Sequence, residues 1–385
     1  MKRVLLLLST LFVLLLTLSA LSLKSNQTSI FSLDSIRAIY ARPSSLWPKP
    51  TIDKGVIFEE LGILPSSPID LSIDSIQRIV ILGKTLFFDP RLSGSDQISC
   101  STCHMPNLNW TDGLKVSIGH GLAQNTRNAP SIENVWFYKS LFWDGRAKNL
   151  EEQAQIPLTS EIEMHQDMKI LPKKLGDIKG YKKLFKKAYG DDKVTTERIF
   201  GSLALFQKTV ISAKTPFDRF LEGDKNSLTA QQLQGLHLFR TKARCMNCHH
   251  GPLFTDNDFH NLGLANYGKA NQDLGLYNAT KNPKDSGKFK TPSLRNVMKT
   301  GPWFHDGSVK TIDSLMELYN MGMLVPAYTL AQMDDPLLPK NDRLLRGIRL
   351  SKTEIKALVS FLEAISVAPI EMKIPVLPRS CIELI

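Results

Sequence analysis

The feature that most constrains this chain is a pair of short motifs, CSTCH at residues 100–104 and CMNCH at residues 245–249. Paired cysteines occur in disulfides, in zinc sites and in attachment sites for c-type haem. Disulfides and zinc ribbons need no histidine directly after the second cysteine. In CxxCH both thiols bond covalently to the haem, and the histidine becomes the proximal ligand of its iron. We therefore predict two covalently bound c-type haems, attached by Cys100 and Cys103 with His104, and by Cys245 and Cys248 with His249.

The two motifs also predict how the chain is organised. They are 145 residues apart, and similar sequences begin at each, CSTCHMPNLNWTDG and CMNCHHGPLFTDND. This repetition predicts a mostly α-helical fold of two cytochrome-c-like domains, each around one haem, with long irregular loops. We place the domains at residues 71–220 and 221–370, after a loose lead segment at 23–70 and before a tail at 371–385.

Helical spacing of apolar residues predicts helices at residues 74–89, 196–212, 229–245 and 351–366. Thr196 is a candidate N-cap for the second of these helices. The sequence SKTE, which opens the last helix, is a capping box. Strand signals are weak, and the stretches rich in Gly, Pro and Asn between these segments predict loops.

The N-terminus predicts export. Residues 1–22, MKRVLLLLSTLFVLLLTLSALS, combine two basic residues with an apolar run, which is typical of a signal peptide or, because the run is long, of an uncleaved membrane anchor. We expect the rest of the chain to lie in the periplasm. The net charge of +11 comes from scattered lysines without a nucleic-acid motif, so we expect no nucleic-acid partner. The fifth cysteine, Cys381, is expected to be a bystander thiol.

Five longer motifs carry a resemblance to a known family. They are LGKTLFFDPRLSGSDQISCSTCH, FWDGRAKNLEEQA, TPFDRFLEGD, HHGPLFTDNDFHNLG and FKTPSLRNVMKTGPWFHDGSVKTI. Together they resemble the bacterial di-haem cytochrome c peroxidases and their relative MauG, from about residue 75 to residue 366. The resemblance implies reduction of hydrogen peroxide at the N-terminal haem, with electrons arriving through the C-terminal haem. It further implies a small electron-donor protein, a cytochrome c or a cupredoxin, and a homodimer as a candidate assembly.

The same resemblance assigns a distal pocket to the first haem. An iron that activates peroxide needs an open coordination position and an acid–base group that moves a proton between the two peroxide oxygens. Gln153 and Glu163 match the residues of this pocket, with Glu163 as the acid–base group and Pro157 in the same wall. Glu161 takes this role if the register is shifted. The competing interpretation of Glu163 is a surface carboxylate.

His120 and Trp143 match two further functional positions of the family. A loop histidine at the place of His120 caps the first haem iron in oxidised peroxidases and moves away on reduction of the other haem, with Gly119 and Gly121 as expected hinges. The alternative is an exposed loop histidine. Trp143 matches a tryptophan between the haems that can relay electrons, and core packing is the alternative. Arg146 is, by its charge, a candidate partner of a haem propionate.

The family usually holds a calcium ion between its haems, and calcium prefers oxygen ligands. Asn128 matches the side-chain ligand, and Thr300 and Pro302 match the backbone carbonyl ligands. His250, which follows His249, is expected at the surface or beside a propionate.

The sixth ligand of the second haem departs from the peroxidase pattern. The peroxidases have a methionine fourteen residues after the histidine of FHDG; here that histidine is His305, and the position holds Tyr319. MauG also has a tyrosine there. A thioether raises the reduction potential of a haem, whereas a phenolate should lower it. We expect Tyr319 to be the ligand, with Met316 as its competitor and Met321 and Met323 nearby.

Three functions follow from these residues. The leading one is a periplasmic di-haem peroxidase. The second, favoured by Tyr319, is a MauG-like enzyme that holds oxidising equivalents from peroxide on both haems and oxidises side chains of a partner protein. The third is a plain electron-shuttling di-haem cytochrome, which would need no acid–base group.

Overall fold

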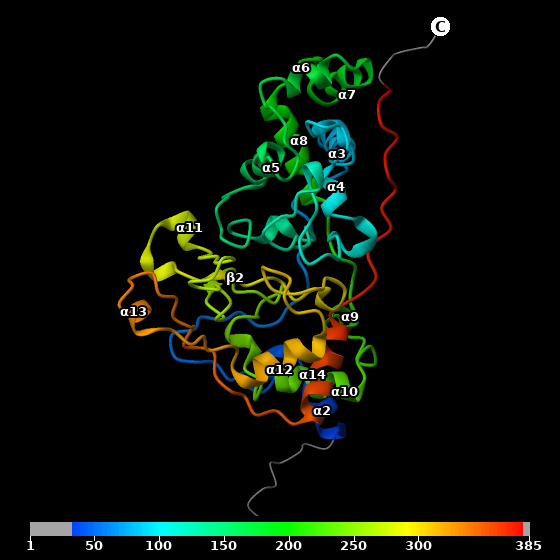
Figure 1. Ribbon diagram of the computed structural model, residues 1–385. Helices are drawn as coiled ribbons and strands as arrows, with labels where there is room; N and C mark the ends of the chain where they lie inside the picture. The colour runs from blue at the N-terminus through cyan, green and yellow to red at the C-terminus, as the bar shows by residue number, and fades with distance from the viewer. Residues whose placement is uncertain (1–32, 380–385) are drawn as a thin grey trace, which may run out of the picture. The chain divides into compact units, whose positions relative to one another are not determined.

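A computed structural model describes residues 33–379, and this part of the chain is mostly helical, as the sequence predicts (Figure 1). The predicted export segment and Cys381 lie outside the described residues. The chain divides into two compact units, the first ending at Trp47 and the second beginning at Pro48.

The described part of the first unit contains a helix that the sequence analysis did not predict. Helix α2 (Leu33–Tyr40) is followed by the 3-10 turn η1 (Ser44–Leu46). The Trp47 indole packs edge-on against Tyr40, with ring centroids 5.0 Å apart, and donates a hydrogen bond to the Arg42 carbonyl at 2.9 Å. The lead segment is therefore ordered by its own aromatic pair over these residues.

The second unit repeats one plan, in which a helix leads into each CxxCH motif. The elements of its N-terminal half are α3 (Asp74–Phe87), η2 (Pro90–Leu92), α4 (Cys100–Cys103), η3 (Pro106–Leu108), η4 (His120–Leu122), η5 (Val135–Phe137), α5 (Leu150–Thr159), α6 (Leu171–Gly176), α7 (Lys179–Tyr189) and α8 (Thr196–Lys208). Those of its C-terminal half are α9 (Pro216–Leu221), α10 (Ala230–Arg240), η6 (Cys245–Asn247), α11 (Tyr277–Thr280), η7 (Pro283–Asp285), η8 (Val297–Lys299), α12 (Ile312–Met321), α13 (Leu330–Met333) and α14 (Lys352–Ala364). The short strands β1 (Phe259–His260) and β2 (Phe289–Lys290) pair antiparallel, Phe259 opposite Lys290.

All four predicted helices form, and each is shorter than expected. The N-cap of α8 is Thr195, whose hydroxyl accepts from the Arg198 amide at 3.3 Å, so the prediction of Thr196 was wrong by one residue. Helix α8 ends at Lys208, and two residues later the Val210 carbonyl accepts a hydrogen bond from the Asn134 amide at 2.9 Å, outside the helical pattern. The SKTE capping box is confirmed at the start of α14, with Ser351 as N-cap.

In each half, the helix before the CxxCH motif crosses a later helix through a glycine (Figure 1). A Cβ atom on Gly83 of α3 would lie 1.9 Å from the Ser202 carbonyl oxygen of α8. A Cβ atom on Gly235 of α10 would lie 2.0 Å from the Ala357 carbonyl oxygen of α14. Only glycine lets the helix backbones approach this closely.

Aromatic side chains at equivalent positions fill the two cores. Phe87 and Phe206 follow the first crossing by one helical turn, with ring centroids 5.2 Å apart. Phe239 and Phe361 follow the second crossing in the same way, with centroids 5.3 Å apart. The repeat inferred from the CxxCH motifs thus extends to the helix crossings beside them.

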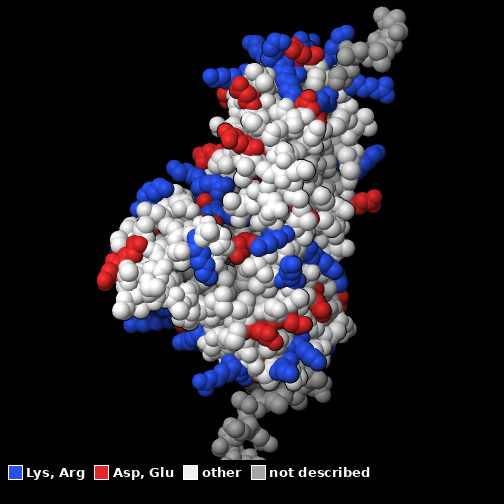
Figure 2. Space-filling view, in the orientation of Figure 1, with Lys and Arg blue, Asp and Glu red and all other residues white. Residues whose placement is uncertain are grey.

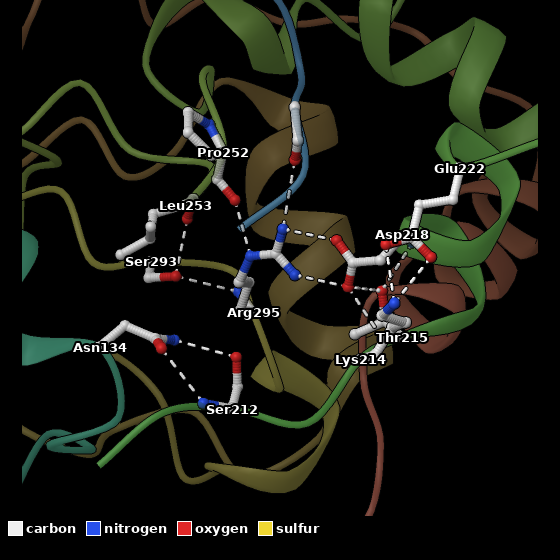
Figure 3. Close-up of polar contacts among 11 residues, drawn as sticks. Asn134, Ser212, Lys214, Thr215, Asp218, Glu222, Pro252, Leu253, Ser293 and Arg295 are labelled. Carbon is white, nitrogen blue, oxygen red and sulfur yellow. Dashed lines mark hydrogen bonds and ion pairs between the residues drawn. The ribbon is translucent and has the colours of Figure 1, made fainter. Parts of the chain in front are cut away.

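A buried ion pair joins three segments of the C-terminal half (Figure 3). The Arg295 guanidinium makes two hydrogen bonds to Asp218 of α9, both 2.9 Å long, and donates to the Pro252 carbonyl at 2.6 Å. The Asp218 carboxylate also accepts from the Thr215 amide at 2.8 Å. The side chains of Arg295 and Asp218 are only 1% and 3% exposed. This pair fixes the segment that follows β2 against α9.

The exposed charge is unevenly distributed (Figure 2). Helix α7 carries five exposed lysines, Lys179, Lys182, Lys183, Lys186 and Lys187, whereas Tyr181 and Phe185 of the same helix are buried. Among residues 33–379, no helix has the length and apolar character needed to span a bilayer.

Candidate haem-binding and active site

The first CxxCH motif faces a cavity, here called the first cavity, that Cys100, Cys103 and His104 line together. The His104 Nδ1 atom lies 3.1 Å from the Trp110 carbonyl oxygen, so Nδ1 carries the proton and Nε2 is left to bind a metal. Burial lowers the pKa of His104, which keeps the ring neutral. Burial also raises the pKa of the Cys100 thiol to about 12.

The second CxxCH motif faces a second cavity, lined by Cys245, Cys248 and His249, with the same geometry. The His249 Nδ1 atom lies 2.9 Å from the Phe254 carbonyl oxygen, and burial again lowers the pKa of the ring. The four cysteines of the two motifs form no disulfide. Reduced cysteine pairs beside oriented neutral imidazoles, each facing a cavity, fit two c-type haems.

His250 differs from its predicted surface position. It is 9% exposed, and its Nδ1 atom accepts a hydrogen bond from the Glu59 amide at 3.4 Å. It is also absent from the lining of the second cavity, because its ring is directed towards the segment that precedes α3.

The distal residues predicted for the first haem meet in the first cavity. Gln153 and Pro157, both on α5, line it together with Glu163. Glu161 is exposed and does not line it, so the structure does not support the shifted register. The side-chain amide of Asn125 donates a hydrogen bond to Glu163 Oε1. Asn125 also lines the cavity and was missed from the sequence, because nothing local links it to a residue 38 positions later.

His120 lies on the loop beside Glu163, but its side chain does not line the first cavity. Its ring packs edge-on against His165, with centroids 4.6 Å apart, and its amide donates to the Glu163 carbonyl at 2.8 Å. Gly119 lets the loop backbone pack closely against the segment that carries Glu163, since a Cβ atom on Gly119 would lie 2.1 Å from the Ile162 carbonyl oxygen. Gly121 has the left-handed φ of 62°. His120 is therefore beside the first cavity but outside its lining, and its role as a gate stays a prediction.

A shared wall separates the two cavities. Trp143 lines both, and its indole donates to the Asn128 carbonyl at 2.9 Å. Tyr138 and Lys290 also line both cavities and were missed from the sequence. The Lys290 ammonium lies 3.9 Å from the Tyr138 ring centroid and donates to the Ser140 carbonyl; burial lowers its pKa to about 7.

Two basic side chains could face haem carboxylates. Arg146 lines the first cavity, where it pairs with Asp144 at 2.9 Å. His260, in the second cavity, was missed from the sequence. Although burial opposes it, the carboxylates of Asp256 and Asp342, which accept hydrogen bonds from the two ring nitrogens, raise the pKa of His260 to about 12. Both ring nitrogens of His260 are thus paired with carboxylates, and Cys248 belongs to the haem-attachment motif, which argues against a metal site among Cys248, Asp256 and His260.

The residues that match calcium ligands lie on one stretch of the second cavity. Asn128, Thr300 and Pro302 all line it. The Asn128 side-chain nitrogen donates to the Leu114 carbonyl at 2.9 Å, so its carbonyl oxygen remains as the acceptor.

Two of the four candidate sixth ligands reach the second cavity. Tyr319 and Met316, both on α12, line it. Met321 is 66% exposed, and Met323 is buried outside the lining. Burial raises the pKa of Tyr319, so the phenol stays neutral unless a cation binds its oxygen.

Comparisons with known proteins agree with this arrangement. Residues 77–226 match the model of the di-haem cytochrome c peroxidase family. The cytochrome c551 peroxidase of Nitrosomonas europaea is 34% identical over 335 residues, which cover 86% of this chain and 93% of that protein. This chain belongs to the di-haem cytochrome c peroxidase family.

Relatives of this peroxidase family include both functional types considered above. The methylamine utilization protein MauG of Methylorubrum extorquens is 36% identical over 302 residues, covering 78% of this chain and 81% of that protein. A solved MauG-like protein associated with microbial copper homeostasis aligns with a TM-score of 0.68 and 29% identity, covering 82% of this chain and 96% of that one. The predictions of the family and of the helical haem-protein fold are thus confirmed. The role of each site residue stays a prediction.

Proposed function

We propose that this chain is a periplasmic di-haem peroxidase that reduces hydrogen peroxide to water at the first cavity. Electrons enter at the second cavity from a small electron-transfer protein such as a cytochrome c. The observation that carries the proposal is the placement of Glu163 and Gln153 in the cavity of His104, with Trp143 lining both cavities. A plain electron shuttle has no use for a carboxylate at this place.

The reaction consumes one hydrogen peroxide, two electrons and two protons and forms two waters. The haem at His104, when bound, supplies the iron that accepts the peroxide oxygen and the electrons. Glu163 moves a proton from the near to the far peroxide oxygen, which turns the far oxygen into a water leaving group. Asn125 orients the Glu163 carboxyl group through its hydrogen bond, and Gln153 supplies a neutral amide for the bound peroxide.

The finer assignments are part of this proposal. Tyr319 is the sixth ligand of the second haem, with Met316 as the alternative in the same wall. A calcium ion held by Asn128, Thr300 and Pro302 fixes the wall between the cavities. The N-terminal segment exports the chain and either is cleaved or anchors it, and a homodimer is the proposed assembly.

The first experiment compares Glu163→Gln with Glu161→Gln in stopped-flow reactions of the haem-loaded protein with peroxide. We expect the first change to slow peroxide turnover by about 100-fold to 10,000-fold, the usual worth of general acid–base catalysis. The second change should have little effect, because Glu161 is exposed and outside the cavity. Unchanged turnover in both variants would leave the electron-shuttle function as the better account.

A second candidate function, MauG-like oxidation of a partner protein, rests on Tyr319 in the second cavity and on the His120 ring, which packs against His165 outside the lining of the first cavity. Stopped-flow absorbance combined with EPR distinguishes this function from that of a gated peroxidase. Rapid reaction of the fully oxidised protein with stoichiometric peroxide, with loss of the ferric EPR signals, favours the MauG-like function. Reaction only after one-electron reduction favours a peroxidase gated by His120.

A further inference from the structure

A buried carboxyl group that neither haem motif uses lies between the two halves of the second unit. Glu133 is 6% exposed and lines the second cavity. Its Oε2 accepts a hydrogen bond from the Asn296 side chain at 2.6 Å, and its Oε1 accepts one from the Asn109 side chain at 3.4 Å. Asn109 follows His104 in the first haem loop, whereas Asn296 belongs to the C-terminal half.

Asn109 and Asn296 are themselves held in place by further hydrogen bonds. The Asn109 carbonyl accepts from the Ser131 hydroxyl at 2.7 Å. The Asn296 amide donates to the Ile365 carbonyl at 3.0 Å, and the Asn296 side-chain oxygen accepts from the Val367 amide at 2.9 Å. The site around Glu133 is therefore built from the first haem loop, the segment before η8 and the end of α14.

No cation offsets a charge on Glu133 among the described residues that pack against it. Arg295, next to Asn296, is committed to Asp218. Lys299 of η8 and Glu363 of α14 are exposed, and Asp112 of the first haem loop accepts from the Ser117 hydroxyl at 2.5 Å. Burial raises the pKa of Glu133 to about 7, although hydrogen bonds from Asn296 and Asn109 act in the opposite direction. Small changes of nearby charge therefore decide whether this group holds a proton.

We propose that Glu133 binds a proton when the haem attached at Cys245 and Cys248 accepts an electron, and releases it when that electron leaves. This proposal rests on the proposed function, because it assigns the second cavity to the haem that receives electrons. The balance of the step is one electron from the donor protein to the haem iron and one proton from water to the Glu133 carboxylate, which becomes a carboxylic acid. Transfer of the electron towards the first cavity reverses the protonation.

The direction of the coupling follows from electrostatics. An oxidised haem carries one positive charge more than a reduced haem, so it favours the Glu133 carboxylate and lowers its proton affinity. Reduction removes that charge, and the carboxyl group, which lacks a cationic partner, then takes up a proton. Electron transfer through the second cavity is thus kept close to charge-neutral in a buried site, where an uncompensated charge is costly.

The test measures the reduction potential of the second haem by spectroscopic titration of the haem-loaded protein, from about pH 5 to about pH 9. Glu133 has a lower pKa when the second haem is oxidised and a higher pKa when that haem is reduced. Between these two pKa values, we expect the reduction potential to fall as pH rises. The limiting slope is 59 mV for each tenfold change in proton concentration, the value of a step with one electron and one proton. Glu133→Gln keeps the side-chain shape and one oxygen that can accept a hydrogen bond, but it is always neutral. It should therefore remove the pH dependence and hold the reduction potential near the low-pH value of the wild type.

Glu363→Gln is the matched control, because it makes the same chemical change at an exposed position of α14. It should keep the wild-type slope. A reduced-minus-oxidised infrared difference spectrum gives a second readout: the wild type should gain a carboxylic acid C=O band on reduction, and Glu133→Gln should lack it. If Glu133→Gln keeps both the slope and the band, haem propionates or another acid take the proton and the proposal is overturned.

These outcomes are separable from those that test the proposed function. Loss of the slope in Glu133→Gln supports the proton coupling even in a protein that turns over no peroxide. Conversely, peroxide turnover with a slope that Glu133→Gln leaves unchanged supports the peroxidase function and overturns the role of Glu133.

Discussion

At the residue scale, the first cavity depends on how the loop after residue 117 is held against the segment that carries Glu163. The His120 amide donates to the Glu163 carbonyl, and the Asn125 side chain donates to the Glu163 carboxylate. Gly119 permits this contact because a larger residue would strike the Ile162 carbonyl. One loop therefore positions both Glu163, the proposed acid–base group, and His120, the histidine expected to gate the cavity, so a change in the loop should alter both together.

Replacing Asn125 by Ala should weaken catalysis without removing the acid–base group. We expect kcat/KM for peroxide to fall by about 10-fold to 100-fold, the range found when a residue that orients a functional group is lost. The loss should appear in kcat more than in KM, because the proton transfer rather than peroxide entry depends on the carboxyl orientation. Gln124→Ala, at an exposed position of the same loop, is the control. Equal kinetics in both variants would show that Glu163 needs no partner to be positioned.

At the element scale, the sequence predicted what depends on neighbours along the chain. The CxxCH turns, the helices before them and the capping box at Ser351 follow from local spacing, and all are present. The predicted end of α8 was too late because apolar Val210 continues the helical pattern but is buried outside the helix, where its carbonyl accepts a hydrogen bond from the distant Asn134 amide. Contacts made across long sequence separations, such as Glu133 with Asn296 or Lys290 with Tyr138, leave no local pattern and were not predictable.

The buried pair of Arg295 and Asp218 gives an element-scale prediction (Figure 3). Asp218→Asn leaves the buried guanidinium without its counter-charge, which should lower the free energy of unfolding by about 3 to 5 kcal/mol. Urea unfolding of the haem-loaded protein, followed by circular dichroism, measures the difference. Lys214→Ala removes the neighbouring exposed pair with Glu222 and should cost no more than about 1 kcal/mol. Similar losses in the two variants would mean that the buried pair does not hold α9 in place.

At the scale of the whole second unit, the repeated halves differ in what closes each cavity. The first cavity offers polar groups that can serve peroxide, Glu163, Gln153 and Asn125. The second offers side chains that can bind iron directly, Tyr319 and Met316. A duplicated plan has thus produced one cavity suited to chemistry and one suited to electron entry. In the proposed function, electrons pass through the wall between the two cavities.

Trp143 is the residue in this wall whose electron-relay role can be tested most directly. An indole is more easily oxidised than a phenyl ring, so Trp143→Phe should slow the reoxidation of the second haem by peroxide while preserving most of the packing. The absorbance of the two haems, followed separately after mixing half-reduced or fully reduced protein with peroxide, measures this rate. Trp136→Phe is the matched control, because Trp136 lies on the same segment, lines neither cavity and has a buried indole nitrogen without a hydrogen-bond partner. A slower rate in Trp143→Phe alone, with unchanged spectra of the resting protein, would assign the electron relay to the indole. Equal rates in both variants would instead mean that Trp143 is a packing residue, which holds Asn128 through its 2.9 Å hydrogen bond.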